Sequence, residues 1–306
     1  MRHILFFFVD GVGIGPASAD NPFAEASYPA LHHLAGEQPW HAPFSARQGA
    51  SRLVRSLDAT LGVEGLPQSG TGQATLLTGT NCARIVGRHF GPFPHSKTHS
   101  TLDQDNLFRQ VKALSDPAPA VAFANAFPPQ FFRAARRRAT VTTHCCQAAG
   151  VSLRDLTALQ HRQAVTADLT GRTWHTQLGL EVPDRSLSEA AEVLLSTARA
   201  HAFTLFEYFL TDKVGHERID TPAARILGDL DRVLAALLDR MDPTRDTLVL
   251  TSDHGNLEAG AHTRHTRNPV PLLVYGWAAP HFTDAADLTD VTPGIVRALR
   301  AAHGSP

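Results

Sequence analysis

The sequence predicts an α/β protein with a doubly wound, mostly parallel sheet and a smaller α/β domain inserted into the chain. Short apolar runs, typical of strands buried on both faces, alternate with stretches whose apolar residues recur at helical spacing. Such alternation is typical of a sheet with helices on both faces. Between about 88 and 190 the composition of the sequence changes, with paired prolines and a run of arginines. We therefore expect a main domain of residues 1–88 and 196–306, and an inserted cap domain of residues 89–195.

The first expected strand spans residues 3–9 and ends at Asp10. Gly11, Gly13 and Gly15 follow it and predict a flexible turn that lets the backbone come close to a ligand. No helical pattern follows this turn, and Pro16 prevents a helix from starting there, so it is not a dinucleotide-binding fingerprint. The other elements expected in this part are a helix at about 29–35, a strand at 51–57, a loop at 62–72 and a helix opening at 74–77.

The expected insert contains two short strand candidates, 120–124 and 164–167, with helical patterns at 130–137 and 152–160. After the insert, a helix at 188–200 has Ser186 or Ser188 as its cap and Glu189 in its first turn. The remaining expected elements are strands at 204–210, 247–251 and 270–275, and helices at 223–238 and 291–301.

Composition excludes several classes of protein. The 306 residues are 43% hydrophobic and 19% charged, which is typical of a globular protein, and the net charge of −1 gives no field that would recruit nucleic acid or a membrane. The first apolar run, residues 4–9, is too short for a signal-peptide core or a membrane span. The three cysteines show no CxxC spacing, so neither a disulfide framework nor a cysteine zinc site is indicated. We expect a reduced, cytoplasmic protein.

Three expected strands lead into an aspartate, and each aspartate has a histidine nearby. Parallel strands place their carboxyl ends on one edge of a sheet, so these side chains are expected to converge there. Asp and His together suit Zn²⁺ or Mn²⁺, and the set is large enough for two divalent ions, which is a site typical of phosphoryl transfer. The residues concerned are Asp10, Asp212, His216, Asp253, His254 and His265.

A two-metal site of this kind needs a nucleophile, and the loop around residues 68–73 offers Ser69 and Thr71. A serine in a glycine-rich loop just before a helix lies near free backbone N–H groups, where a phosphate can bind. Metal coordination would lower the pKa of its hydroxyl and activate it. The alternative is that Ser69 only caps the helix.

These features occur in the order found in a known family. The motifs, in chain order, are Val9-Asp10-Gly11-Val12-Gly13-Ile14-Gly15, Gly65-Leu66-Pro67-Gln68-Ser69-x-x-Gly72, Asp212-x-x-x-His216, Ser252-Asp253-His254-Gly255-Asn256, His265-Thr266-x-Asn268-Pro269-Val270-Pro271 and Leu288-Thr289-Asp290-Val291-Thr292-Pro293. By these motifs the sequence resembles the alkaline phosphatase superfamily, specifically the branch with cofactor-independent phosphoglycerate mutase and phosphopentomutase. The resemblance covers roughly 1–88 and 200–303.

The resemblance implies an alkaline phosphatase-like fold and a division of the ligands between two metal ions, Mn²⁺ or Zn²⁺. One ion would be held by Asp212, His216 and His265. The other would be held by Asp10, Asp253, His254 and the Ser69 oxygen. Ser69 rather than Thr71 matches the family nucleophile, because it lies three residues before Gly72. The implied function is a phosphomutase or phosphomonoesterase that acts on a small phosphorylated metabolite through a phosphoserine at Ser69.

The sequence departs from the family at Gln73, where the mutases carry a histidine, and the expected insert is about half the length of the phosphoglycerate mutase cap. Candidate substrate-binding residues are Lys213 beside a metal ligand, Arg84 after the nucleophile helix, and Arg133 and Arg136 in the arginine cluster. A cluster of this kind is also typical of a solvated helix face.

Other functions remain alternatives at this point. Whether the phosphoryl group returns to the substrate or passes to water depends on how well the site excludes water, which the sequence does not show. A sulfatase is disfavoured, because a Cys/Ser-x-Pro-x-Arg motif is absent. A non-catalytic metal-binding or regulatory protein could keep the same fold, although the complete set of expected ligands with Ser69 argues against it.

Overall fold

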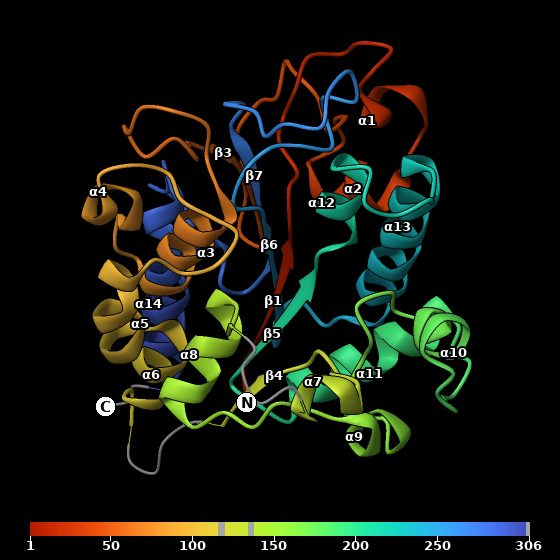
Figure 1. Cartoon of the computed structure of the whole chain (residues 1–306). Helices are drawn as coiled ribbons and strands as arrows, with labels where there is room; N and C mark the ends of the chain where they lie inside the picture. The colour runs from red at the N-terminus through yellow and green to blue at the C-terminus, as the bar shows by residue number, and fades with distance from the viewer. Residues whose placement is uncertain (116–119, 134–137, 304–306) are drawn as a thin grey trace.

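The structure is a computed structural model that describes residues 1–115, 120–133 and 138–303. Seven strands form one mixed sheet in the order β2-β3-β7-β6-β1-β5-β4 (Figure 1). Strands β4, β5, β1 and β6 are parallel, and β7, β3 and β2 add antiparallel pairs at one side. The strands are β1 His3–Val9, β2 Arg47–Gln48, β3 Arg52–Leu57, β4 Val121–Phe123, β5 Phe203–Tyr208, β6 Asp246–Thr251 and β7 Val270–Gly276.

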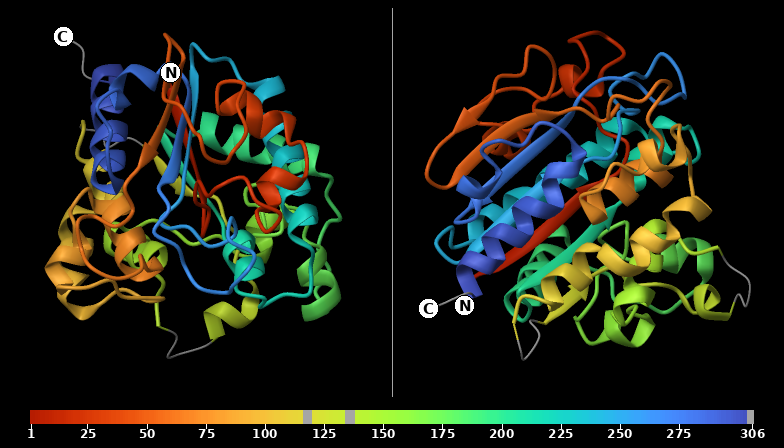
Figure 2. Two further views of the ribbon diagram at one scale, coloured as in Figure 1. Left: turned by 90° about the horizontal axis from the view of Figure 1, so that it is seen from above. Right: turned by 90° about the vertical axis from the view of Figure 1, so that its left-hand side faces the viewer.

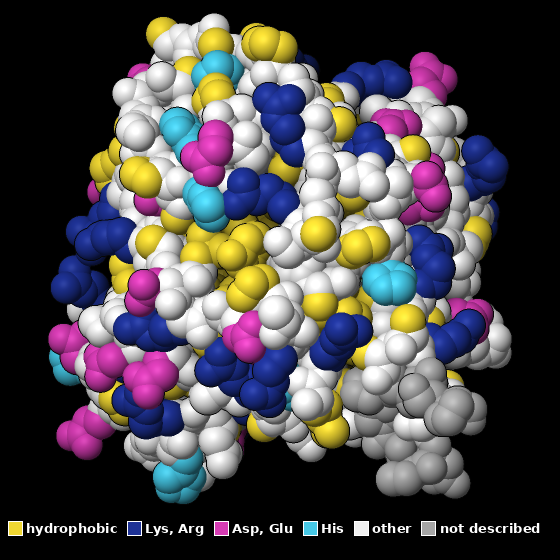
Figure 3. Space-filling model, turned by 180° about the vertical axis from the view of Figure 1, so that it is seen from behind, with side chains coloured by type: hydrophobic (Ala, Val, Ile, Leu, Met, Phe, Trp, Pro, Cys, Tyr) yellow, Lys and Arg dark blue, Asp and Glu magenta, His cyan; other side chains and the backbone are white. Residues whose placement is uncertain are grey.

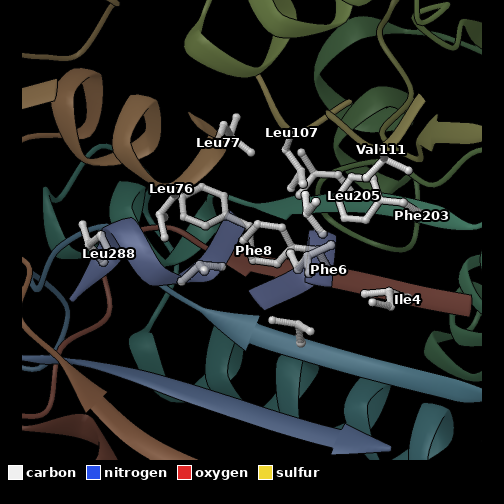
Figure 4. Packing of buried hydrophobic residues seen from close by; sticks show 14 of the residues in the cluster. Ile4, Phe6, Phe8, Leu76, Leu77, Leu107, Val111, Phe203, Leu205 and Leu288 are labelled. Atoms are coloured by element: carbon white, nitrogen blue, oxygen red, sulfur yellow. The ribbon is translucent and has the colours of Figure 1, made fainter. Parts of the chain in front are cut away.

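The central strand β1 is buried on both faces, and its alternating side chains build two cores. Phe6 and Phe8 point to one face, where they pack among leucines of two helices and of β5 (Figure 4). Phe7 and Val9 point to the opposite face and belong to the second core. This follows from the period of two along a strand. It explains why the strand reads as a continuous apolar run rather than an alternating one.

Helices cover both faces, so the sheet lies between two helical layers (Figure 2). The layer over Phe6 and Phe8 contains α3 Ser69–Thr78, α4 Cys82–Val86, α5 His99–Asp105, α6 Leu107–Lys112, α8 Val141–Ala149 and α14 Val291–His303. The opposite layer contains α1 Pro22–Glu25, α2 Pro29–Leu34, α11 Leu187–Arg199, α12 Leu210–Gly215 and α13 Ala223–Arg240. The other short α-helices of the described residues are α7 Pro129–Arg133, α9 Leu156–Gln160 and α10 Arg172–Leu178, and three 3-10 helices span Ser96–Thr98, Ala279–Phe282 and Leu288–Asp290.

The α/β class is confirmed, with differences in detail. The sheet is mixed rather than mostly parallel, because β7 runs against β6 and β3 runs against β7. Residues 164–167 are not a strand: Val165 makes a single bridge to Asn125. The helix expected to open at 74–77 begins earlier, at Ser69. Part of the helix expected at 130–137 forms α7, and residues 134–137 lie outside the described residues.

No separate cap domain is seen in the described part of residues 89–195. Strand β4 from this stretch is the edge strand of the central sheet, paired with β5. Helices α5, α6 and α8 bury Leu102, Phe108 and Cys145 in the same core as Phe6. Only a small satellite cluster around Leu159 and Trp174 lies apart. The domain bounds at 88 and 196 stay a prediction.

No described helix is long and apolar enough to cross a membrane. On the face turned away from the viewer of Figure 1, basic and acidic side chains are interspersed (Figure 3). This mixture agrees with the small net charge.

Candidate metal centre

The predicted ligands converge because three neighbouring strands end side by side. Asp10 follows β1, and Asp253 with His254 follows β6, the neighbour of β1 on one side. On the other side, β5 leads into α12, which carries Asp212. His265 arrives from the loop before β7. This is the carboxyl edge of the parallel strands, where sites in α/β sheets lie.

The first ligand group consists of Asp212, His216 and His265. The helical turn of α12 brings His216 Nε2 within 3.3 Å of Asp212 Oδ1, and His265 Nε2 lies 3.7 Å from the same oxygen. The two Nε2 atoms are 2.9 Å apart. These three residues have ligand atoms close enough together to hold one metal ion.

Backbone carbonyls determine which nitrogen of each ring in this group carries a proton. His216 Nδ1 lies 2.7 Å from the carbonyl oxygen of Thr263, and His265 Nδ1 lies 2.7 Å from that of Pro67. A carbonyl only accepts, so both Nδ1 atoms must donate. When both rings are neutral, each Nε2 is then an acceptor, and the two Nε2 atoms lie 2.9 Å apart. Two acceptors this close repel each other, and a cation bound to both would remove the repulsion. This outer hydrogen bonding is typical of metal-binding histidines.

The second group surrounds His254. Its Nε2 lies 3.5 Å from Asp10 Oδ1, 3.4 Å from Asp253 Oδ2 and 2.9 Å from Ser69 Oγ. Both carboxylate oxygens are buried and have no hydrogen-bond partner in the described structure. A buried polar atom without a partner costs free energy, and a divalent cation would remove that cost. The donor set therefore fits a metal ion.

The two groups adjoin each other. The rings of His254 and His265 stack with centroids 3.7 Å apart. Asp212 also groups with Asp10 and His254 within ligand distance. The resemblance assigns Asp212 to one ion only, whereas the structure places its carboxylate within reach of both groups.

Burial sets the protonation of these side chains in the absence of a metal. It lowers the pKa of His254 and of His265 to about 4, so both rings are neutral at pH 7. Burial, followed by the charge of Asp212, raises the pKa of Asp253 to about 6. Burial and the charge of Asp253 raise the pKa of Asp10 well above its ordinary value. Crowded carboxylates beside neutral imidazoles are a costly arrangement that cations would stabilise.

Ser69 lies at the first position of α3, with its side chain toward the second ligand group. Gly72 permits this approach, because a Cβ there would come within 2.9 Å of the Asp253 backbone oxygen. The hydroxyl of Thr71 is occupied elsewhere: it donates to the Gln68 carbonyl and accepts from the Phe90 N–H. Of the two candidate nucleophiles, only Ser69 has its hydroxyl beside the predicted ligands.

A cleft of about 360 Å³ opens onto this centre. It exposes Ser69 together with Asp212, His216 and His265, so a ligand in the cleft can reach both groups. The rest of its lining comes from loops 66–68, 91–92 and 263–264 and from Arg218.

Comparison with known proteins identifies the family. A family model described as the metalloenzyme superfamily matches residues 2–303. The chain belongs to this superfamily.

Its similarity to individual members is distant. The 2,3-bisphosphoglycerate-independent phosphoglycerate mutase of Aliivibrio fischeri is 28% identical over 123 residues, which are 37% of this chain and 24% of that protein. The enzyme of the same name from Pseudomonas putida is 27% identical over 126 residues, 38% of this chain and 25% of that protein. The matched region thus spans about a quarter of the length of these curated relatives.

Solved structures share the fold of this superfamily member over nearly all of the chain. The alkaline phosphatase of the Antarctic bacterium TAB5 aligns with a TM-score of 0.58 and 10% identity, covering 97% of this chain and 98% of that one. A phosphoglycerate mutase from Leishmania mexicana aligns with a TM-score of 0.51 and 14% identity, covering 97% and 95%. The alkaline phosphatase-like fold and the distant similarity to cofactor-independent phosphoglycerate mutase, both expected from the motifs, are thereby confirmed.

Glu258 is a buried residue of the superfamily site that the sequence reasoning missed. Its carboxylate accepts hydrogen bonds from the Gly13 and Asn256 N–H groups, the Thr266 hydroxyl and the Asn268 amide. It thereby ties together the loops that follow β1 and β6 and the loop that precedes β7. No local pattern marks this residue, since its partners come from distant parts of the chain.

The glycines after β1 have a different role from the one expected. A Cβ on Gly13 or Gly15 would collide with the Glu258 side chain, and so would one on Gly255. The backbone comes close to Glu258 rather than to a ligand. Gly11, with φ +71°, lies against Asp212.

Lys213, Arg84 and Arg133 are not among the described residues that line the cleft. The Lys213 ammonium lies 4.6 Å from the centre of the Phe209 ring. Arg84 and Arg133 are exposed on α4 and α7, and Arg136 lies outside the described residues. Arg218 and Arg264, which the sequence analysis did not select, are the arginines among the described lining residues.

Gln73, the departure from the family motif, is buried within this centre. Its Nε2 donates to Asp10 Oδ2 over 3.3 Å. The amide thus contacts a predicted ligand and orients its carboxylate.

Proposed function

We propose that the protein is a two-metal phosphoryl-transfer enzyme, a phosphomutase or phosphomonoesterase, that works through a phosphoserine at Ser69. The observation that carries this proposal is the position of Ser69 Oγ. It lies 2.9 Å from His254 Nε2, at the start of α3, and opens onto the same cleft as Asp212, His216 and His265. A nucleophile beside two ligand groups is the arrangement that phosphoryl transfer requires.

The residues have separable roles in this proposal. Asp212, His216 and His265 would hold one ion, and Asp10, Asp253 and His254 would hold the other with the Ser69 oxygen. Mn²⁺ or Zn²⁺ suits these donors and, when bound, stabilises negative charge on the attacking and leaving oxygens. Ser69 Oγ forms a bond to phosphorus while the bond to the substrate oxygen breaks. The phosphoryl group then passes to a hydroxyl of the retained substrate in a mutase, or to water in a phosphatase.

The cleft supports a small phosphorylated metabolite as the substrate. Its volume of about 360 Å³ is at the lower end of the range for small-molecule sites. Arg218 and Arg264 at its rim add positive charge beside the place where a phosphate would bind. A screen of phosphomonoesters and sugar phosphates with added Mn²⁺ should follow both free phosphate and isomerised product, because the two outcomes distinguish phosphatase from mutase.

Replacement of the nucleophile is the direct test. We expect Ser69→Ala to abolish turnover and to leave the thermal unfolding temperature nearly unchanged, because one small polar group is removed. Metal affinity should fall only modestly, since Asp10, Asp253 and His254 remain. After brief incubation with substrate and an acid quench, mass spectrometry should find a phosphate on the peptide that carries Ser69.

Thr71→Ala is the matched control on the same loop, and we expect it to retain turnover because the Thr71 hydroxyl binds only backbone groups. Loss of activity in Thr71→Ala together with an active Ser69→Ala would exclude Ser69 as the nucleophile. That outcome would not contradict the assignment of the two groups of metal ligands.

A further inference from the structure

A second cavity lies near the amino-terminal ends of the parallel strands, whereas the candidate metal centre lies at their carboxyl ends. Its volume is about 850 Å³, and it is lined where β4 begins and where α6 and α11 end, at the lower end of the molecule in Figure 1. The loop 150–155 between α8 and α9 closes one side. None of the predicted metal ligands lines it. It is therefore separate from the cleft at Ser69.

Positive charge predominates among the described side chains of this cavity. Lys112, Arg154 and Arg162 line it, against one carboxylate, Asp155. The Asp155 carboxylate accepts a hydrogen bond from the Ala158 N–H and caps α9. This reduces its capacity to form ion pairs with the three basic side chains. Such a balance favours an anionic ligand.

The basic groups differ in how far they are already paired. Arg162 makes ion pairs with Glu189 and Glu192 on α11, outside the cavity lining. The Lys112 ammonium donates to the Ala149 carbonyl over 2.9 Å and keeps two further N–H bonds free of described partners. Arg162 is thus neutralised, whereas Lys112 retains donors.

Arg154 is the group that lacks a partner. Its side chain is half-buried, and among the described residues it makes no hydrogen bond and no ion pair. Burial lowers its pKa. The guanidinium is partly withdrawn from water and has no described partner, and a carboxylate or phosphate would satisfy its N–H donors in a bidentate geometry.

His201 adds a further polar group to the same wall. Its Nδ1 lies 2.7 Å from the Thr197 carbonyl, so this nitrogen donates and Nε2 is left without a described partner. The protonated ring would donate from Nε2 to an anion. The neutral ring would accept from a ligand hydroxyl or from water.

We propose that this cavity binds a small anionic metabolite with a phosphate or carboxylate group, held by Arg154 with Lys112 and His201 beside it. The volume lies within the range of about 300–1,000 Å³ that is typical of small-molecule sites. The ligand binds away from Ser69, so the proposal does not depend on the chemistry at the metal centre.

Hydrogen–deuterium exchange of the metal-loaded protein tests the proposal, because it locates binding along the chain. The probes are inorganic phosphate, adenosine monophosphate and succinate, each titrated to millimolar concentration. We expect at least one probe to slow exchange in peptides covering 150–163 and 196–201. Binding at the metal centre would instead slow exchange in peptides covering 67–73 and 253–265, so the two sites are distinguishable.

Variants of Arg154 sharpen the test. Loss of a charge-assisted bidentate contact should raise the dissociation constant at the cavity about tenfold or more in Arg154→Gln. Arg154→Lys should have a smaller effect, because it keeps the charge. Arg300→Gln is the matched control at an exposed position of α14, outside the cavity lining, and it should bind as the wild type does.

The proposal is overturned if no probe slows exchange in the cavity peptides, or if Arg154→Gln binds as tightly as the wild type. Thermal unfolding of each variant is measured alongside. Should Arg154→Gln unfold early, Arg154→Lys and Lys112→Gln serve as the deciding variants.

Discussion

At the scale of single residues, the candidate metal centre is a group of charges whose protonation sets its affinity for metal. The two buried histidines are neutral above about pH 4, so they do not compete with a cation near neutrality. The carboxylates do compete, because burial and mutual repulsion raise the pKa of Asp253 to about 6 and that of Asp10 well above its ordinary value. A cation must displace those protons before it can bind.

We therefore expect the affinity for Mn²⁺ to fall as the pH drops through about 6, by about tenfold per pH unit for each proton displaced. The sign follows from the raised carboxylate pKa values: the metal-free protein holds the extra protons at low pH, and metal binding releases them. Equilibrium dialysis between pH 8 and pH 5 measures the effect. Affinity that stays constant across this range would show that the carboxylates are not ligands.

Glu258 acts on the centre through other residues. All four of its hydrogen-bond partners are donors, so only a carboxylate can satisfy them together. We expect Glu258→Gln to lower the free energy of unfolding of the metal-free protein by about 3 kcal/mol, because an amide turns its own N–H groups toward two of those donors. Urea denaturation measures this.

Calorimetric titration of Glu258→Gln with Mn²⁺ separates a positioning role from a merely structural one. If Glu258 holds the ligand-bearing loops in register, metal affinity falls even under conditions where the variant is fully folded. Glu64→Gln is the control, since Glu64 is exposed and has no hydrogen bond or ion pair to a described residue. Equal effects of the two substitutions would contradict the role given to Glu258.

At the scale of elements, local signals explain what the sequence could predict. The N-terminal start of α11 is an example: Ser186 and Glu189 form a reciprocal capping box. We expect Ser186→Ala to lower the free energy of unfolding by about 1 kcal/mol, because an N–H at the helix start loses its acceptor. Ser188→Ala, the other cap considered from the sequence, should change it by less than about 0.5 kcal/mol. Urea denaturation of both variants decides between them.

The elements that the sequence did not predict depend on contacts between distant residues. Residues 164–167 have the composition of a strand, yet only Val165 bridges to Asn125. The pair β2 with β3 and the direction of β7 are set by neighbours in the sheet, which no local pattern encodes. The candidate site could be predicted further than the fold, because Asp10, Asp253 and their companions carry ordered motifs, whereas Glu258 and Arg218 do not.

At the scale of the whole molecule, one continuous sheet with a core on each face argues for cooperative unfolding. Phe108 of α6 is fully buried and packs against Phe203 of β5 with ring centroids 5.6 Å apart. Removal of this ring should therefore lower the stability of the whole fold, although Phe108 lies in the stretch expected to be a separate domain.

We expect Phe108→Ala to lower the free energy of unfolding by about 3–5 kcal/mol and to shift a single transition. Circular dichroism and tryptophan fluorescence should report the same midpoint. Phe132→Ala is the control, because that ring is 49% exposed on α7, and its effect should be much smaller. If two separate unfolding transitions were observed and only one of them shifted, residues 89–195 would be an independently folding domain.

The central position of β1 has a consequence for biosynthesis. Both of its neighbours, β5 and β6, lie within residues 203–251, so β1 is synthesised well before either of them. Until β5 and β6 have been synthesised, this strand has no native partner on either edge. Parallel pairings of such long sequence separation form slowly, and unpaired apolar strands aggregate. We therefore expect the nascent chain to need residues 3–9 shielded from aggregation until β5 and β6 have been made.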